Sequence, residues 1–298
     1  MKLIREHCCC PSFLIAVAGP WLCVLGAVFV DYVVVEELTD FIWIGDHPYK
    51  DYKVKSVARI LASLGKGLAE LEEFYKGLPL NNPQPDHQRF FPFIQHYTVE
   101  GVVIKFKYQE YLKPKTPESA SKALFIATTE TEEPRHIIVK FVERYNTEAH
   151  RLLAASNHAP ELIYYSTDDP DPPNLGGLFM VVMEYVDGQT AHDWYGKQRL
   201  PQHIFKQVEE ALGILHEQNL VFGDLRQPNI MIKKDERVLL IDFDWCGNHN
   251  TNTYPFRLND DRDPERGIGW HAGVKRGGTM KKEHDVHMLD KMRPVLIS

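Results

Sequence analysis

The N-terminal part of the chain begins with a long uncharged stretch. Residues 11–30 carry no charged side chain, follow Lys2 and Arg5, and are about as long as a membrane span or a signal peptide requires. Gly19 and Pro20 interrupt the stretch at its middle, and β-branched residues continue the apolar pattern beyond it, as is typical of strands. The pattern favours a buried hairpin over a membrane anchor, although an anchor stays open at this stage.

An amphipathic helix is predicted to follow from Val57. Apolar residues recur there at three- and four-residue spacing, and Gly77 stands where a helix C-terminal cap belongs. The apolar positions are Ile60, Leu61, Leu64, Leu68 and Leu71. Residues 81–85 then interrupt the pattern with two prolines, as a turn-rich linker does. We therefore expect an N-terminal extension over residues 1–90 and a main domain over residues 91–298.

The main domain opens with runs that are rich in β-branched and aromatic residues. These runs are 97–108, 123–130, 135–142 and 177–186. Polar segments separate them, and Asn146 or Thr147 is placed to cap a helix between the third run and the fourth. The pattern indicates a small antiparallel sheet with one helix among its strands, ending at about Glu184.

The remaining residues, 185–298, are expected to form a helix-rich part. Pro201 suits a first helical turn, and one apolar stripe follows it. The stripe consists of Ile204, Val208, Leu212 and Leu215. The predicted helix leads into the loop VFGDLRQPNI, residues 221–230, and the next apolar run, RVLLIDFDW, ends in Asp242 and Asp244. A short helix is predicted within residues 281–292.

Composition and charge exclude several classes of protein. The net charge is -7 and no basic cluster occurs, which argues against a nucleic-acid surface. Five cysteines without repeated spacing favour neither a disulfide framework nor a zinc module, so we expect an intracellular, reducing compartment such as cytoplasm or nucleus. His284 and His287 lie one helical turn apart, but their spacing matches no known zinc pattern, and we expect surface histidines.

Phosphoryl transfer needs a carboxylate near the acceptor hydroxyl, oxygen ligands for magnesium, and cations on the phosphates. The chain offers Asp224 and Asn229 five positions apart in one loop, and Asp242 eighteen positions after Asp224 at a strand end. Lys140 is the lysine of the strand-like segment IIVKF. In this order the sequence resembles the protein kinase superfamily, whose D-L-x-x-x-N catalytic loop precedes a D-F-G strand end.

The resemblance implies roles for these residues. Asp224 would orient or deprotonate the acceptor hydroxyl, while Asn229 and Asp242 would bind magnesium. Lys140 would hold the ATP phosphates, and Arg226 takes the place of a phosphate-contacting lysine.

Further positions follow from the same resemblance. Glu148, in the predicted helix, would pair with Lys140, and the segment that contains Met183, Glu184 and Val186 resembles the hinge whose backbone binds adenine. Asp285 matches a buried helix aspartate that braces the catalytic loop, which is a structural role.

The chain also departs from the kinase pattern. Phe222 and Gly223 replace the usual His and Arg before the catalytic aspartate, and Gly223 followed by Asp224 is similar to the H-G-D loop of aminoglycoside and choline kinases. Asp244 replaces the glycine of D-F-G, which adds a metal ligand or stiffens the turn. Residues 113–122 lack the glycine-rich pattern that wraps phosphates. Several segments, among them IDFDWCG and WHAGV, resemble a group of protein-kinase-like proteins abundant in fungi.

The sequence therefore predicts an α+β, bilobal protein-kinase-like fold, with a small antiparallel-sheet lobe over about 91–184 and a helical lobe over about 185–298. The expected activity is ATP- and Mg²⁺-dependent phosphoryl transfer to a protein serine or threonine hydroxyl. A small-molecule hydroxyl acceptor and a pseudokinase that acts as a binding scaffold are the alternatives. We expect neither a nucleic-acid partner nor a membrane association.

Overall fold

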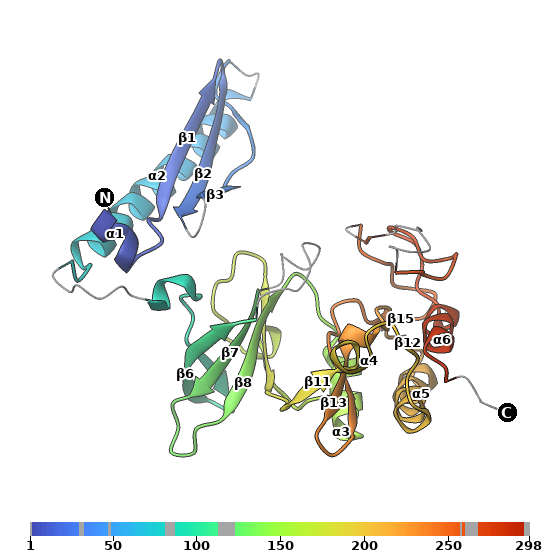
Figure 1. Ribbon diagram of the computed structural model, residues 1–298. Coiled ribbons are helices and arrows are strands. Elements are labelled where there is room, and N and C mark those ends of the chain that lie inside the picture. Colours follow the sequence, from blue (N-terminus) through green and yellow to red (C-terminus); the bar gives the residue numbers. More distant parts are fainter. Residues whose placement is uncertain are drawn as a thin grey trace. The chain divides into compact units, whose positions relative to one another are not determined.

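The chain folds into two compact units, residues 1–93 and 94–298, in the computed structural model (Figure 1). The structure describes residues 2–29, 33–46, 49–80, 87–112, 123–256, 258–259 and 268–294. The proline-containing linker at 81–85 and the glycine-poor segment at 113–122 lie outside the described residues.

The first unit is built on the hairpin that the sequence predicts. Strand β1 (Ser12–Ala18) pairs antiparallel with β2 (Trp21–Phe29), and Gly19 has a φ of 57° in the turn between them. Strands β3 (Val33–Glu37) and β4 (Ile42–Trp43) both pair antiparallel with β2. A short helix, α1 (Lys2–His7), precedes the sheet. The hairpin interpretation of residues 11–30 is confirmed.

The expected burial of this hairpin is wrong for β1. Leu14, Ile15 and Val17 are 42%, 55% and 63% exposed, whereas Leu22, Cys23 and Val24 of β2 are buried. The physical reason is that a strand's side chains are buried only where another layer packs on that face of the sheet, and the described residues leave these three side chains largely uncovered. Among the residues that the structure describes, no helix is long and apolar enough to cross a membrane.

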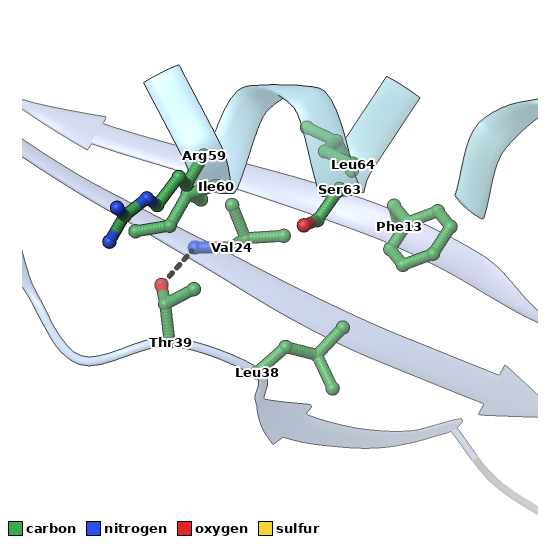
Figure 2. A pocket seen from close by; sticks show the side chains of 8 residues that line it. All are labelled: Phe13, Val24, Leu38, Thr39, Arg59, Ile60, Ser63 and Leu64. Atoms are coloured by element: carbon green, nitrogen blue, oxygen red, sulfur yellow. Dashed lines mark hydrogen bonds between the residues drawn. The ribbon is translucent and has the colours of Figure 1, made fainter. Parts of the chain in front are cut away.

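Helix α2 (Lys50–Lys76) packs on this sheet. It begins seven residues before the predicted start, and Gly77 is its C-terminal cap, as predicted. Figure 2 shows Ile60 and Leu64 of the helix beside Val24 of β2. Apolar side chains from the helix and the sheet thus form the small core of the first unit.

The second unit opens with a six-stranded antiparallel sheet in the order β5-β6-β7-β8-β10-β9. Its strands are β5 (His96–Val99), β6 (Val102–Tyr111), β7 (Ala123–Thr129), β8 (His136–Val142), β9 (Leu162–Tyr165) and β10 (Phe179–Glu184). The run predicted at 97–108 is two strands, because Glu100 and Gly101 make a tight turn with φ values of 51° and 78°. Strand β9 was not predicted, since its four residues are too few to show an alternating pattern.

Helix α3 (Thr147–Ala155) lies in sequence between β8 and β9. The side chain of Asn146 caps it by accepting a hydrogen bond of 2.9 Å from the Ala149 amide, as the sequence predicts. Asn146 also donates from its own amide to the Phe243 carbonyl and from Nδ2 to the Cys246 carbonyl, at 3.3 Å each. The start of α3 is therefore tied to the backbone of residues 243–246.

The rest of the unit is richer in helix. Its elements are β11 (Gly188–Thr190), α4 (Ala191–Tyr195), α5 (Gln202–Glu217), β12 (Leu220–Val221), β13 (Ile230–Lys233), β14 (Val238–Leu240), β15 (Gly247–Asn248) and α6 (Lys282–Lys291). Among the residues that the structure describes, the short 3₁₀ helices are η1 (His87–Phe90), η3 (Ser166–Asp168) and η4 (Gln227–Asn229). The predicted apolar stripe of α5 is buried in the core. The unit is thus an α+β fold with a sheet-rich half followed by a helix-rich half.

Candidate active site

The loop between β12 and β13 is held by a buried carboxylate on α6. Asp285 accepts hydrogen bonds from the backbone amides of Phe222 and Gly223, at 2.7 and 2.9 Å. His216 Nε2 lies 3.0 Å from the same carboxylate, which is 1% exposed. Because both carboxylate oxygens bind the loop directly, the predicted structural role of Asp285 is confirmed.

Gly223 has a conformation and surroundings that only glycine fits. Its φ is 81°, in the left-handed region that L-residues rarely adopt. A Cβ atom built there would overlap the terminal methyl group of Met280 and lie 3.0 Å from the Trp245 carbonyl oxygen. This geometry accounts for the departure from the usual arginine at this position.

Asp224 follows Gly223 and is buried, at 3% exposed. Arg226 binds its carboxylate in a bidentate manner, with Nε and Nη2 donating over 2.6 and 2.8 Å. Asn229 donates from Nδ2 to the carbonyl and to Oδ2 of Asp224, at 2.9 Å each. The side-chain amide oxygen of Asn229, Oδ1, is the atom that would ligate a metal, and these two hydrogen bonds from Nδ2 do not use it. The structure thus brings together three of the predicted site residues.

Lys140 lies on β8 between its neighbours on β7 and β10, and it is buried. Its Nζ is 2.6 Å from Asp242 Oδ1 and 2.5 Å from Asp244 Oδ1. Burial alone would lower the pKa of Lys140, but the two carboxylates outweigh it and raise the pKa above its ordinary value. The ammonium group therefore stays charged between two anions.

A backbone hydrogen bond joins the two parts of the site. The Ile241 amide donates to the Asn229 carbonyl over 3.0 Å, so Asp242 directly follows a residue that is bonded to the catalytic loop. Asp242 itself has a φ of 74°, an uncommon conformation for a non-glycine residue. Such outliers concentrate at functional sites, where the surrounding structure holds them.

Phe243 fixes the turn between the two carboxylates. Its ring is fully buried, stacks on His150 of α3 at 4.6 Å, and meets Phe222 edge to face at 5.6 Å. Burial lowers the pKa of His150 from 6.5 to about 4. Its Nε2 donates to the Pro160 carbonyl and its Nδ1 accepts from the Tyr145 hydroxyl, at 2.8 Å each, as a neutral ring does. α3 thus positions Asp242 and Asp244 through this ring stack.

Glu148 does not meet Lys140 in the structure. It lies exposed in the first turn of α3, and Lys140 is bonded to Asp242 and Asp244. The sequence suggested that Asp244 adds a metal ligand or stiffens the turn, but it did not reveal that Asp244 also pairs with Lys140. Arg144 was missed as well: it donates from Nε to the Asp244 carbonyl over 2.7 Å. A lone arginine at a strand end gives no signal for such a contact.

The predicted hinge residues leave the sheet at the end of β10. Met183 pairs with Ile138 of β8, two residues before Lys140, and both Met183 and Val186 are buried. The Glu184 amide donates to the Glu161 carbonyl over 2.9 Å. The structure therefore carries this segment from the strand beside Lys140 towards the helix-rich half.

The donor set of the site suits a hard cation. Asp242 and Asp244 supply carboxylate oxygens, Asn229 supplies an amide oxygen, and Mg²⁺ prefers oxygen ligands of this kind. Two carboxylates lie beside the Lys140 ammonium group, and an anionic set of oxygen atoms of this kind favours a cation. The residues present thus fit a magnesium ion.

Comparison with known proteins shows what the region around this site is similar to. Residues 128–259 match the model of the protein kinase domain. Over 108 residues, 35% of the chain, the sequence is 34% identical to the serine/threonine-protein kinase PknB of Mycolicibacterium smegmatis and 32% identical to PknB of Mycobacterium tuberculosis. It is 28% identical over 120 residues, 39% of the chain, to the probable serine/threonine-protein kinase mkcB of Dictyostelium discoideum.

These matches cover 17%, 17% and 16% of the respective relatives, so the chain spans about a sixth of their length. The kinase-domain match contains Lys140, the loop at 221–230 and both carboxylates after β14. The match runs from the end of β7 to residue 259, so α6 lies beyond it. Over these residues the second unit is therefore similar to a protein kinase domain, and its sheet-rich and helix-rich halves are consistent with the bilobal α+β fold of that domain.

Proposed function

We propose that the chain is an ATP-dependent phosphotransferase that acts on a hydroxyl group. The observation that supports this most is the placement of Lys140 between Asp242 and Asp244, joined by one backbone hydrogen bond to the loop that holds Asp224 and Asn229. Phosphoryl transfer is catalysed mainly by positioned charge, and this site gathers carboxylates, an amide and cations within one buried cluster.

Each residue takes a role that its surroundings support. Asp224, oriented by Arg226 and Asn229, accepts the proton of the acceptor hydroxyl. Arg226 binds the Asp224 carboxylate in a bidentate manner and its side chain is 28% exposed, so its guanidinium is able to reach the transferring phosphoryl group. Lys140 binds the phosphates of ATP.

The cofactor is held by the remaining residues. Asn229 and Asp242 bind magnesium, which supplies electrostatic stabilisation of the phosphate charge. The extended segment that contains Met183, Glu184 and Val186 offers backbone donors and acceptors to adenine. Glu148 lies at the edge of this arrangement, and rotation of α3 would be needed to bring it to Lys140.

For the acceptor, we propose a serine or threonine hydroxyl of a protein. The support is the similarity of the matched segment to serine/threonine-protein kinases. Gly223 supports the alternative of a small-molecule hydroxyl acceptor, because a glycine directly before the catalytic aspartate resembles the loop of aminoglycoside and choline kinases.

One observation favours a second candidate, a nucleotide-free binding scaffold. The ammonium of Lys140 and the guanidinium of Arg226 are both bonded to carboxylates of the site itself. Binding of ATP has to break these ion pairs, and a scaffold that binds no nucleotide would keep them permanently.

The decisive experiment compares the wild-type chain with Asp224→Asn. We expect the variant to lose phosphate transfer from ATP to casein, and background ATP hydrolysis, by about a hundredfold or more. ATP affinity, measured by isothermal titration with magnesium, should stay within about twofold, because Asp224 faces the acceptor and not the nucleotide. Asp235→Asn, at an exposed carboxylate paired with Arg237, is the matched control and should change neither quantity.

The scaffold reading makes opposite predictions. Undetectable ATP binding by the wild-type chain, or equal turnover for wild type and Asp224→Asn, would refute the proposal that the chain is a phosphotransferase. A wild type that transfers phosphate to an aminoglycoside or choline but not to casein would refute the protein acceptor alone.

A further inference from the structure

A second cluster of metal-ligating side chains lies behind the catalytic loop, and phosphoryl transfer does not use it. The ligand atoms of His271, Glu283 and His284 all lie within 4.8 Å of one another. Glu283 and His284 stand on the first turn of α6, while His271 lies in the segment before that helix. Sequence reasoning expected His284 on the surface, and this expectation is wrong: the residue is 2% exposed.

His284 carries a buried nitrogen without a hydrogen-bond partner. Within the described part of the chain, its Nε2 has no partner, although the ring is almost fully buried. Its other nitrogen, Nδ1, is 3.0 Å from the Tyr254 hydroxyl and 3.3 Å from the Lys281 amide. A buried polar atom without a partner costs free energy, so such an atom in a folded protein points to an unseen ligand.

His284 Nε2 and His271 Nδ1 both lie beside Gly273. A Cβ atom built on Gly273 would lie 2.7 Å from His284 Nε2 and 3.2 Å from His271 Nδ1, so the glycine packs directly against both rings. A side chain at position 273 would crowd both nitrogens. His271 Nδ1 accepts from the Gly273 amide over 3.0 Å, and a metal bound at this nitrogen would replace that hydrogen bond.

The segment that carries His271 is fixed to α6 by other contacts. Lys291 Nζ donates to the carbonyls of Ile268 and Gly269 over 3.0 and 2.9 Å. His287 Nε2 lies 3.2 Å from the Gly269 carbonyl oxygen. The two imidazoles are therefore brought together by packing that does not depend on a bound ion.

We propose that His271, Glu283 and His284 bind one zinc ion, with two imidazole nitrogens and one carboxylate oxygen as ligands. Two histidines and a glutamate are an established zinc donor set, whereas magnesium and calcium prefer oxygen alone. At a tetrahedral zinc the ligand atoms lie about 3.3 Å apart. Glu283 is exposed and makes only a 3.4 Å contact with Lys281, so its side chain is able to rotate and close the site.

Tyr254 completes the arrangement around the metal. When Nε2 of His284 binds zinc, Nδ1 carries the proton, so it donates to the Tyr254 hydroxyl oxygen and gives up the hydrogen bond that it accepts from the Lys281 amide. Burial and the neighbouring His271 lower the pKa of His284, which keeps the ring neutral and available as a ligand. Zinc would tie the 268–274 segment to the helix whose Asp285 holds the catalytic loop.

The test is metal binding by the full chain, read independently of any activity. The purified chain, stripped with a chelator, is titrated with ZnCl₂ in competition with a fluorescent zinc indicator. We expect one tight equivalent and a rise in Tm that the chelator reverses. Glu283→Gln should weaken binding about tenfold or more, and His271→Ala about a hundredfold or more. His203→Ala, at an exposed histidine that pairs with Glu236, is the control and should bind as wild type does.

Cobalt separates this site from the cysteines. Co²⁺ at two imidazoles and a carboxylate gives visible d–d bands without the near-ultraviolet charge-transfer band of a cobalt–thiolate bond. A strong thiolate band would place the metal at Cys8, Cys9 or Cys10 and overturn the proposal. Unchanged zinc affinity in both Glu283→Gln and His271→Ala would overturn it equally. Glu283 is exposed, so its substitution leaves the fold intact and the result interpretable.

Discussion

Gly223→Ala is expected to destabilise the second unit more than the size of a methyl group suggests. At the observed φ of 81°, an L-residue in the left-handed region costs about 1–2 kcal/mol. The new Cβ would overlap the Met280 methyl and press on the Trp245 carbonyl oxygen, and overpacking of this kind costs about 1–3 kcal/mol. Met280 is fully buried, so its side chain has little room to move away.

Together these contributions predict a loss of about 2–5 kcal/mol in the free energy of unfolding, with a Tm that falls by roughly 5–15 °C for a unit of this size. Urea denaturation with linear extrapolation measures the first quantity and a thermal melt the second. Gly213→Ala is the matched control, because Gly213 lies inside α5 with open space where its Cβ would be. It should be neutral or stabilise by up to about 1 kcal/mol.

The reasoning fails if Gly223→Ala unfolds within about 0.5 kcal/mol of wild type while Gly213→Ala behaves as expected. That outcome would mean that the loop relaxes around a side chain, and that the absence of arginine at position 223 has no steric cause.

Three further predictions concern buried polar groups. Asp285→Asn leaves one loop amide facing an NH₂ group and should lower the free energy of unfolding by about 1–3 kcal/mol, whereas the exposed Asp290→Asn should change it little. The pKa of His150 is about 4 when folded and 6.5 when unfolded, so the unfolded state binds the extra proton as pH falls. The free energy of unfolding should therefore decline from pH 6.5 towards pH 4, by about 2 kcal/mol between pH 7 and 5 in urea titrations. His150→Gln should remove that loss. Asp242→Asn should abolish the magnesium dependence of ATP binding in isothermal titration, and an unchanged dependence would disprove the metal assignment.

The parts of the site that sequence spacing predicted are those joined by short segments. Asp224 and Asn229 meet because one loop turn holds them both, and Asp242 arrives beside them on the next strand of the same small sheet. Lys140 reaches this point because β8 is a buried central strand of its sheet. In each case a local element fixes the position of the residue.

The pairing of Glu148 with Lys140 depended on the rotation of α3 against the sheet, which no local pattern encodes. Asn146 ties the start of α3 to the backbone of Phe243 and Cys246, and this tertiary contact sets where Glu148 lies. Sequence spacing alone therefore could not have placed the glutamate.

The burial of individual side chains was the other property that could not be predicted from the sequence. The hairpin at residues 11–30 was recognisable from Gly19 and its apolar flanks, but apolarity does not say whether a second layer covers the strand, and β1 is largely exposed. His284 shows the converse, because Tyr254 and the segment before α6 bury a residue that a helical pattern leaves at the surface.

The bond between Asp285 and the catalytic loop also has a consequence for the order in which the chain becomes functional during synthesis. The loop amides and their acceptor are 63 and 62 positions apart in sequence, with the acceptor downstream. At typical rates of translation, roughly 3–13 s separate the synthesis of the loop from the synthesis of Asp285. During that interval the sheet and α5 are already made, but the amides of Phe222 and Gly223 lack their carboxylate. The nascent chain should therefore acquire its catalytic geometry late, as one of its last steps, and any nucleotide bound before α6 emerges would meet an unfinished loop.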